Sequence, residues 1–175
     1  MSSGPEVLVL ALALPLALAG CGFRPLYGGG PAGAAVSAQL DEVDVGLLPD
    51  RQGQLLRQAL EADLQRAGAP GFYRYYLKVS YGGWAGQPLG LQPDSSNTRV
   101  RYIASARWEL TAEGNRTTVI ARGTAEAMDA ANIIDNQNFA ATLDQGVLRH
   151  HFAQRLARQI TAQLAAYFRN HPDRG

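Results

Sequence analysis

Apolar and polar residues alternate one by one in two stretches of the chain, from Tyr73 to Tyr81 and from Thr98 to Thr111. Strict alternation puts every second side chain on the same face, which is typical of strands with one buried and one wet face. After a predicted hairpin turn at Glu113–Asn115, a further strand is expected from Arg116 to Met128. A weaker alternation from Gln39 to Leu47 predicts a first strand. The chain is therefore expected to build a four-stranded sheet.

Two other segments repeat apolar residues at helical spacing, Gln52 to Ala67 and Phe139 to Asn170. Asp50 is the expected N-cap of the first of these helices. The order of elements is β-α-β-β-β-α, in which the crossover after the first strand favours parallel pairing with the second. This order predicts an α+β fold, a two-layer α/β sandwich with two helices packed on one face of a four-stranded mixed sheet.

Glycine and proline mark the predicted connections. Gly28 to Ala35, GGGPAGAA, is expected to be a flexible spacer, and Gly82 to Asn97 a long loop of the kind that often carries function. By length the chain holds one domain, expected at residues 38–170. It is preceded by an N-terminal region and spacer at 21–37 and followed by a tail at 171–175.

The N-terminal segment has the features of a secretory signal. Val7 to Ala19 carries no charge, and its 13 residues are too few for a membrane span, which needs about 20 apolar residues. The run ends in Leu18-Ala19-Gly20-Cys21, with small residues before the only cysteine in the chain. This resembles the lipobox of bacterial lipoproteins, in which the signal is cut before a cysteine that carries diacylglycerol and an N-acyl chain. Residues 1–20 are therefore expected to be removed, and Cys21 to anchor the chain in a membrane.

Charge and composition argue against several other functions. The net charge is +1, and it becomes +2 without residues 1–20, which contain one acid and no base. So small a positive charge does not indicate nucleic-acid binding. His150 and His151 are adjacent, so on a helix they point about 100° apart and do not chelate one metal ion together. No Ser-His-Asp set and no glycine-rich phosphate loop after a strand is recognisable. We therefore expect a protein that is not an enzyme and has no cofactor apart from the lipid on Cys21.

Basic residues gather on the polar faces of two predicted strands. The candidates for binding lipid phosphate groups are Arg74, Lys78, Arg99, Arg101 and Arg107. Arginine is suited to this because its planar guanidinium binds phosphate oxygens in pairs. Two alternative roles of these basic residues stay open. They are either solvated side chains on an exposed sheet face that hinder pairing at its edges, or they contact the polar inner wall of a membrane barrel.

Aromatic residues lie on the opposite, apolar faces of the same strands. They are Tyr73, Tyr75, Tyr81, Tyr102 and Trp108. Because they alternate with polar residues, packing beneath the helices is favoured over a surface that stacks on lipid. Phe23, Leu26 and Tyr27 follow Cys21 closely and are expected either to rest in the membrane interface or to pack on a partner.

The segment Leu18 to Gly28, LAGCGFRPLYG, resembles the start of the lipopolysaccharide-assembly lipoprotein family LptE, particularly its alphaproteobacterial members. Arg51 to Leu56 in the first helix and the Asn138-Phe139-Ala140 opening of the last helix are similar to the same family. The order of elements also fits. The resemblance covers nearly all of the mature chain and implies a role without catalysis.

The resemblance implies a place at the outer membrane, which Gly22 favours, since an aspartate after the cysteine retains enterobacterial lipoproteins in the inner membrane. Family members sit as a plug inside the large β-barrel LptD, help it assemble and assist delivery of lipopolysaccharide to the outer leaflet. The expected partners are therefore an LptD-like barrel, lipopolysaccharide and the membrane. The alternatives are an auxiliary lipoprotein of an ABC-type or MCE-type lipid-transport system and a lipid-tethered periplasmic hydrolase.

Overall fold

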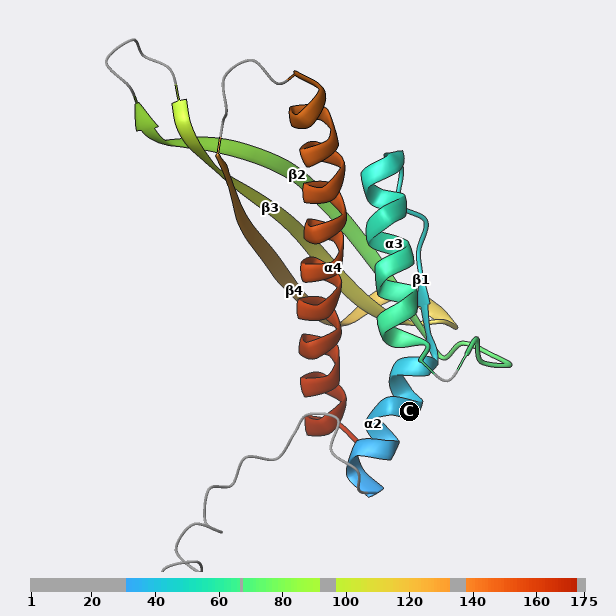
Figure 1. The fold of residues 1–175 in the computed structure, drawn as a ribbon. Helices are drawn as coiled ribbons and strands as arrows, with labels where there is room; N and C mark the ends of the chain where they lie inside the picture. Colours follow the sequence, from blue (N-terminus) through green and yellow to red (C-terminus); the bar gives the residue numbers. More distant parts are fainter. Residues whose placement is uncertain (1–30, 67, 92–96, 133–137, 173–175) are drawn as a thin grey trace, which may run out of the picture.

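The computed structural model describes residues 31–66, 68–91, 97–132 and 138–172 (Figure 1). Their helices and strands are α2 (Pro31–Asp41), β1 (Val43–Val45), α3 (Asp50–Leu64), β2 (Tyr75–Leu91), β3 (Asn97–Ala112), β4 (Asn115–Asn132) and α4 (Asn138–Asn170). Figure 1 shows α4 lying across the sheet with α3 beside it, while the far ends of β2 and β3 extend past the helices. The expected signal, the expected lipidation site at Cys21 and the aromatic residues after it lie outside the described residues.

The four strands form one mixed sheet in the order β1-β2-β3-β4. β1 runs parallel to β2, with Val43 opposite Tyr75, and the other two pairings are antiparallel. The parallel pair requires a crossover, which α3 provides. The predicted α+β class, the mixed sheet and the parallel first pairing are therefore confirmed.

The core lies between the helices and one face of the sheet. From α3 the buried apolar side chains are Leu56, Leu60 and Leu64, and from α4 they include Phe152, Leu156, Ile160, Leu164 and Phe168. The strands contribute alternate residues, including Tyr75, Leu77, Val79, Ala104, Ala106, Trp108 and Leu110. Burying a side chain of leucine size contributes about 1.5–3 kcal/mol, so the helical stripes and strand alternation together account for the layered fold.

The expected spacer is partly helical, which adds a third helix to the described part of the chain. Residues 31–41 form α2, so the spacer prediction was wrong for Pro31 to Ala35 and the first strand begins at Val43 instead of Gln39. Alanine has the highest helix propensity, and proline is well suited to a first helical position, so PAGAA favours a helix once its apolar side is covered. Val36 and Leu40 supply that side, being 5% and 2% exposed.

The expected loop from Gly82 to Asn97 is in fact strand up to Leu91, with β3 starting at Asn97. The register passes from Tyr81 opposite Ala106 to Trp84 opposite Ala104, so two glycines face one residue and form a β-bulge. Gly83 has φ +83°, which glycine adopts without strain. Beyond the bulge Trp84 returns to the helical side, where its ring lies 6.0 Å from that of Phe152.

The first long helix also differs at both ends from the prediction. Asp50 was expected to be the N-cap, but Pro49 holds that position, no side chain caps the helix, and Asp50 is the first helical residue with φ +65°. Aspartate is among the residues that tolerate this region best. The helix ends at Leu64, three residues before the predicted end, and Gly68 follows with φ +104°.

The outer edge of β4 is sealed by side chains of α4. The Gln163 amide donates to the Thr124 carbonyl at 2.8 Å, the Glu126 amide N–H donates to Gln159 at 3.0 Å, and Arg155 donates to the Met128 carbonyl at 2.7 Å. An open edge offers unpaired main-chain groups to other chains. These contacts occupy such groups along the middle of β4 and so prevent another strand from pairing there.

Candidate functional site on the open face of the sheet

The face of the sheet opposite the helices carries the charged side chains of the strands. The exposed basic residues there include Lys78, Arg101, Arg107 and Arg122. They share this face because strand side chains alternate and their neighbours in the chain point toward the helices. The predicted division of β3 into an apolar and a polar face is therefore confirmed from Val100 to Leu110.

A row of residues of both charges crosses three strands. Lys78 on β2 lies opposite Glu109 on β3, and Glu109 lies opposite Arg122 on β4. Directly opposed side chains have Cβ atoms about 4.5–5.5 Å apart, so Glu109 occupies the central position of a row that has a basic residue on either side. Arg107 lies in the next row, between hydroxyl-bearing residues on both neighbouring strands.

The structure does not gather the five predicted phosphate-binding residues into one site. Arg74 has its Nε 3.1 Å from Oε2 of Glu42, and both residues line a hollow with α2 and the end of α4, away from the open face. Arg101 and Arg107 are six residues apart on one strand, which separates them by about 20 Å. Arg99 pairs in register beyond Arg101, and its side chain lies outside the described part of the chain.

Arg122 is a basic residue of this face that the sequence analysis did not single out. Its position between the inward residues Ala121 and Gly123 in the predicted strand was the available signal. The missing information was the register that places it beside Glu109. The face as a whole is mixed in charge, because Glu109 and Glu126 alternate with the cations. The open face is therefore not a single basic patch.

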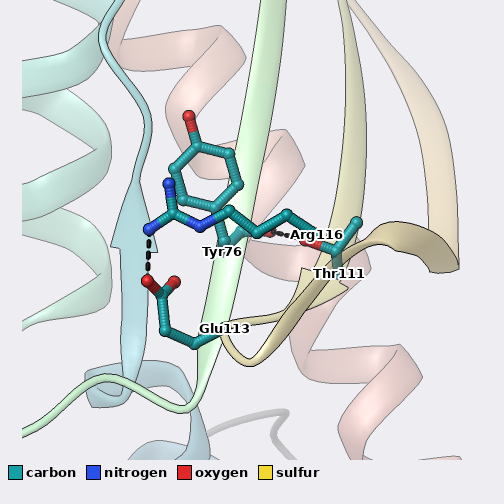
Figure 2. Close-up of polar contacts among 4 residues, drawn as sticks. All are labelled: Tyr76, Thr111, Glu113 and Arg116. Carbon is teal, nitrogen blue, oxygen red and sulfur yellow. Dashed lines mark hydrogen bonds and ion pairs between the residues drawn. The ribbon is translucent and has the colours of Figure 1, made fainter.

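A polar cluster closes the open face at the β3–β4 turn (Figure 2). The Arg116 guanidinium lies 3.9 Å from the centre of the Tyr76 ring and pairs with Glu113. Thr111 donates to the Tyr76 carbonyl at 3.4 Å. On its other side the Tyr76 hydroxyl covers Gly46, where a Cβ would come within 2.5 Å of it. The Tyr76 ring thus links the ends of β1 and β4 across the sheet.

The aromatic residues of the opposite face are mainly core. Tyr75 and Trp108 are 2% and 4% exposed, and the Trp108 indole donates to Gln163 at 2.7 Å. Tyr81 and Tyr102 are partly buried and pack against the same core. The preference for core packing over a lipid-stacking surface is therefore confirmed for these four residues.

Two of these tyrosines are expected to lower the stability of the domain at alkaline pH. Burial raises the pKa of Tyr75 and of Tyr81 above the ordinary 10.0, with opposing effects from Arg74 and Arg149 respectively. A raised pKa in the folded state favours the neutral phenol, so this contribution is complete below pH 10.0 and is lost as pH rises through the folded-state pKa. We therefore expect the free energy of unfolding, measured with urea, to fall as the pH rises above 10.0. Tyr75→Phe combined with Tyr81→Phe should flatten the decline, and an unchanged slope would contradict the assignment.

Neither a metal centre nor a membrane-spanning helix is present among the described residues. His150 and His151 occupy successive positions on α4, and His151 Nδ1 lies 3.6 Å from Oδ2 of Asp129. His150 instead lines a hollow between α3 and α4. The two imidazoles therefore face different surroundings, as their spacing predicts.

Comparison with known proteins gives a likeness in structure alone, since no family model and no curated protein sequence matches the chain. A candidate lipoprotein from Caulobacter crescentus CB15 is 24% identical with a TM-score of 0.62, over 77% of this chain and 96% of that one. Rare lipoprotein B from Shewanella oneidensis is 12% identical with a TM-score of 0.57, over 75% and 97%. A minor lipoprotein from Acinetobacter baumannii is 19% identical with a TM-score of 0.53, over 71% and 89%. The chain therefore has the α+β fold found in these bacterial lipoproteins.

Proposed function

We propose that this chain is a lipid-anchored outer-membrane lipoprotein that acts, without catalysis, as a subunit of the lipopolysaccharide translocon. In this role the domain plugs an LptD-like β-barrel, helps it assemble and assists delivery of lipopolysaccharide to the outer leaflet. The observation that carries the proposal is the conjunction of the Leu18–Cys21 lipobox with a fold shared by bacterial lipoproteins.

The surface chemistry supports a polar protein partner. The lumen of an outer-membrane barrel is polar, and such a lumen can be plugged by a protein domain. The open face of the sheet presents cations and carboxylates together, including the row formed by Lys78, Glu109 and Arg122. Mixed charges of this kind favour pairing with a polar wall that itself carries both signs.

Affinity purification from detergent-solubilised outer membrane tests the proposal most directly. The tagged chain should bring down a large barrel protein, and depletion of the chain should reduce both that barrel and surface lipopolysaccharide. Recovery of an ABC or MCE complex in place of a barrel would support the alternative transport system. Depletion that leaves the barrel and the lipopolysaccharide unchanged would refute the translocon role.

The lipid on Cys21 is expected to be a secondary attachment, because an enclosing barrel already holds the domain. In Cys21→Ala with a cleavable signal, membrane localisation before assembly should weaken more than binding to the purified barrel. Fractionation of barrel-depleted cells and pull-down with isolated barrel measure the two effects separately. Equal loss in both assays would show that the lipid, and not the domain, makes the main contact.

The basic residues give a separate test of lipopolysaccharide binding. Replacing Arg99, Arg101 and Arg107 together by glutamate should weaken retention of lipopolysaccharide by about tenfold or more if these side chains contact its phosphates. The matched control is Arg57→Glu combined with Arg66→Glu and Arg169→Glu, which changes the same charge on α3, just beyond α3 and at the end of α4. Equal retention in the two triple variants would exclude a phosphate-binding role for the open face.

A further inference from the structure

The edge of β2 is open where β1 ends. The last main-chain bond between them runs from the Gly46 N–H to the Leu77 carbonyl at 2.9 Å, and Tyr75 also donates toward this side, to the Glu42 carbonyl at 3.2 Å. Main-chain groups of a strand point to alternate sides, so Val79 and Tyr81 direct theirs to the same side as Leu77. Among the described residues, none bonds to these outward groups.

A hollow of about 730 Å³ lies at this position. Five consecutive residues of β2, Val79–Gly83, line it, together with Pro49–Gln52 at the start of α3 and Arg149 of α4. Consecutive strand residues point to opposite faces, so a hollow lined by all five runs along the strand edge and not over one face. Five residues of strand span about 16 Å, which is the length of a short added strand.

The side chains around the hollow favour a partner with carboxylates. Two basic residues, Arg51 and Arg149, and one acidic residue, Asp50, line the hollow. The Nε of Arg149 is buried and has no hydrogen-bond partner among the described residues. A buried charged donor without an acceptor is unfavourable, and a carboxylate satisfies it best. Leu47, where the open edge begins, is 84% exposed and offers an apolar contact beside it.

We propose that the open β2 edge from Val79 to Gly83 binds an extended acidic segment of another protein, which adds to the sheet as a further strand in line with β1. Main-chain bonds to Val79 and Tyr81 supply affinity, and carboxylates facing Arg51 and Arg149 supply selectivity. The contrast with β4 supports this, because the fold seals that edge and leaves this one unpaired. The inference does not depend on the translocon role, since it concerns a different surface.

The test is fluorescence anisotropy of a labelled, capped Glu-Val-Glu-Val-Glu-Val peptide titrated with the full chain in detergent. The acidic peptide should bind, and a Lys-Val counterpart should bind at least about tenfold more weakly. Methylating the amide nitrogens of one alternate set of residues should abolish binding, whereas methylating the other set should leave it. Equal effects of the two methylated peptides would rule out strand pairing.

The protein offers matched controls for charge and for location. Arg51→Glu, an exposed change in the first turn of α3, should weaken binding about tenfold, whereas Arg66→Glu just beyond the same helix should change it less than about twofold. Hydrogen exchange at the Val79 and Tyr81 amides should slow when peptide binds, while the Glu126 amide, already bonded to Gln159, should not change. Protection of the Val79 and Tyr81 amides before peptide is added would overturn the proposal. It would mean that the chain's own N-terminus, or a second copy detected by sedimentation, already covers the edge.

Discussion

Phe168→Ala should destabilise the domain by about 3–5 kcal/mol. Phe168 is 1% exposed near the end of α4, and its ring centre lies 5.0 Å from that of Tyr75 and 5.7 Å from that of Tyr167. Its removal leaves a cavity between the helix layer and β2, and the rings around it lose their contacts. Urea denaturation followed by circular dichroism measures the change as a shift in midpoint at constant slope.

Phe72→Ala is the matched control, because it removes the same atoms from a side chain that is 62% exposed. We expect it to change stability by less than about 0.5 kcal/mol. A loss below about 1 kcal/mol for Phe168→Ala, or equal losses for the two variants, would contradict the packing of α4 on β2.

Gly123→Ala should destabilise the domain by about 1–3 kcal/mol although it adds only one methyl group. A Cβ at Gly123 would lie 2.7 Å from Cζ2 of Trp108 and 2.9 Å from Oε1 of Gln163. The added atom must displace the indole or the amide, and either movement disturbs the bonds from Trp108 to Gln163 and from Gln163 to the carbonyl of Thr124. The same urea measurement, with tryptophan fluorescence as a second probe, reports both effects.

Gly71→Ala provides the comparison, since nothing lies within 4 Å of a Cβ at that position. It should be neutral or slightly stabilising, because alanine restricts the unfolded chain more than glycine does. If Gly123→Ala were as mild as Gly71→Ala, with unchanged fluorescence, the close contact between β4 and the indole would be wrong.

The sequence predicted the layers because a single period dominated each long element. From Tyr75 to Val79 the alternation matches the burial of every second residue, and the leucines of α3 are buried at the predicted helical spacing. Parallel pairing of β1 and β2 followed from the helix between them. These features depend on local periodicity and connection length, both of which a single sequence contains.

Two glycine-rich segments misled the prediction for opposite reasons. Around Gly82 and Gly83 the glycines suggested a loop, yet they make one bulge, after which the strand continues with Trp84 against the core. At residues 31–35 the three preceding glycines suggested a spacer, although the alanines favour a helix and the apolar residues that stabilise it come later, at Val36 and Leu40. In both cases a tertiary contact decided the local structure.

The candidate site was predictable as a face and not as a set of contacts. Alternation along β3 placed Arg101 and Arg107 together, but only the register shows that Glu109 stands between Lys78 and Arg122. Register between strands distant in sequence depends on bulges such as the one at Gly82, which moves every later pairing by one residue. The pairing of Arg74 with Glu42 depends in the same way on where β1 begins.

The contacts that α4 makes along the edge of β4 require the rise of a helix to match the rise of a strand. Four residues of helix rise about 6.0 Å and two residues of strand about 6.6 Å, so Gln163, Gln159 and Arg155 meet Thr124, Glu126 and Met128 in step. The mismatch grows by about 0.6 Å with each step, which limits such a seal to a few contacts before side chains no longer reach. Inserting one residue into either element would shift all contacts beyond it at once, so length in this region is constrained more tightly than residue identity.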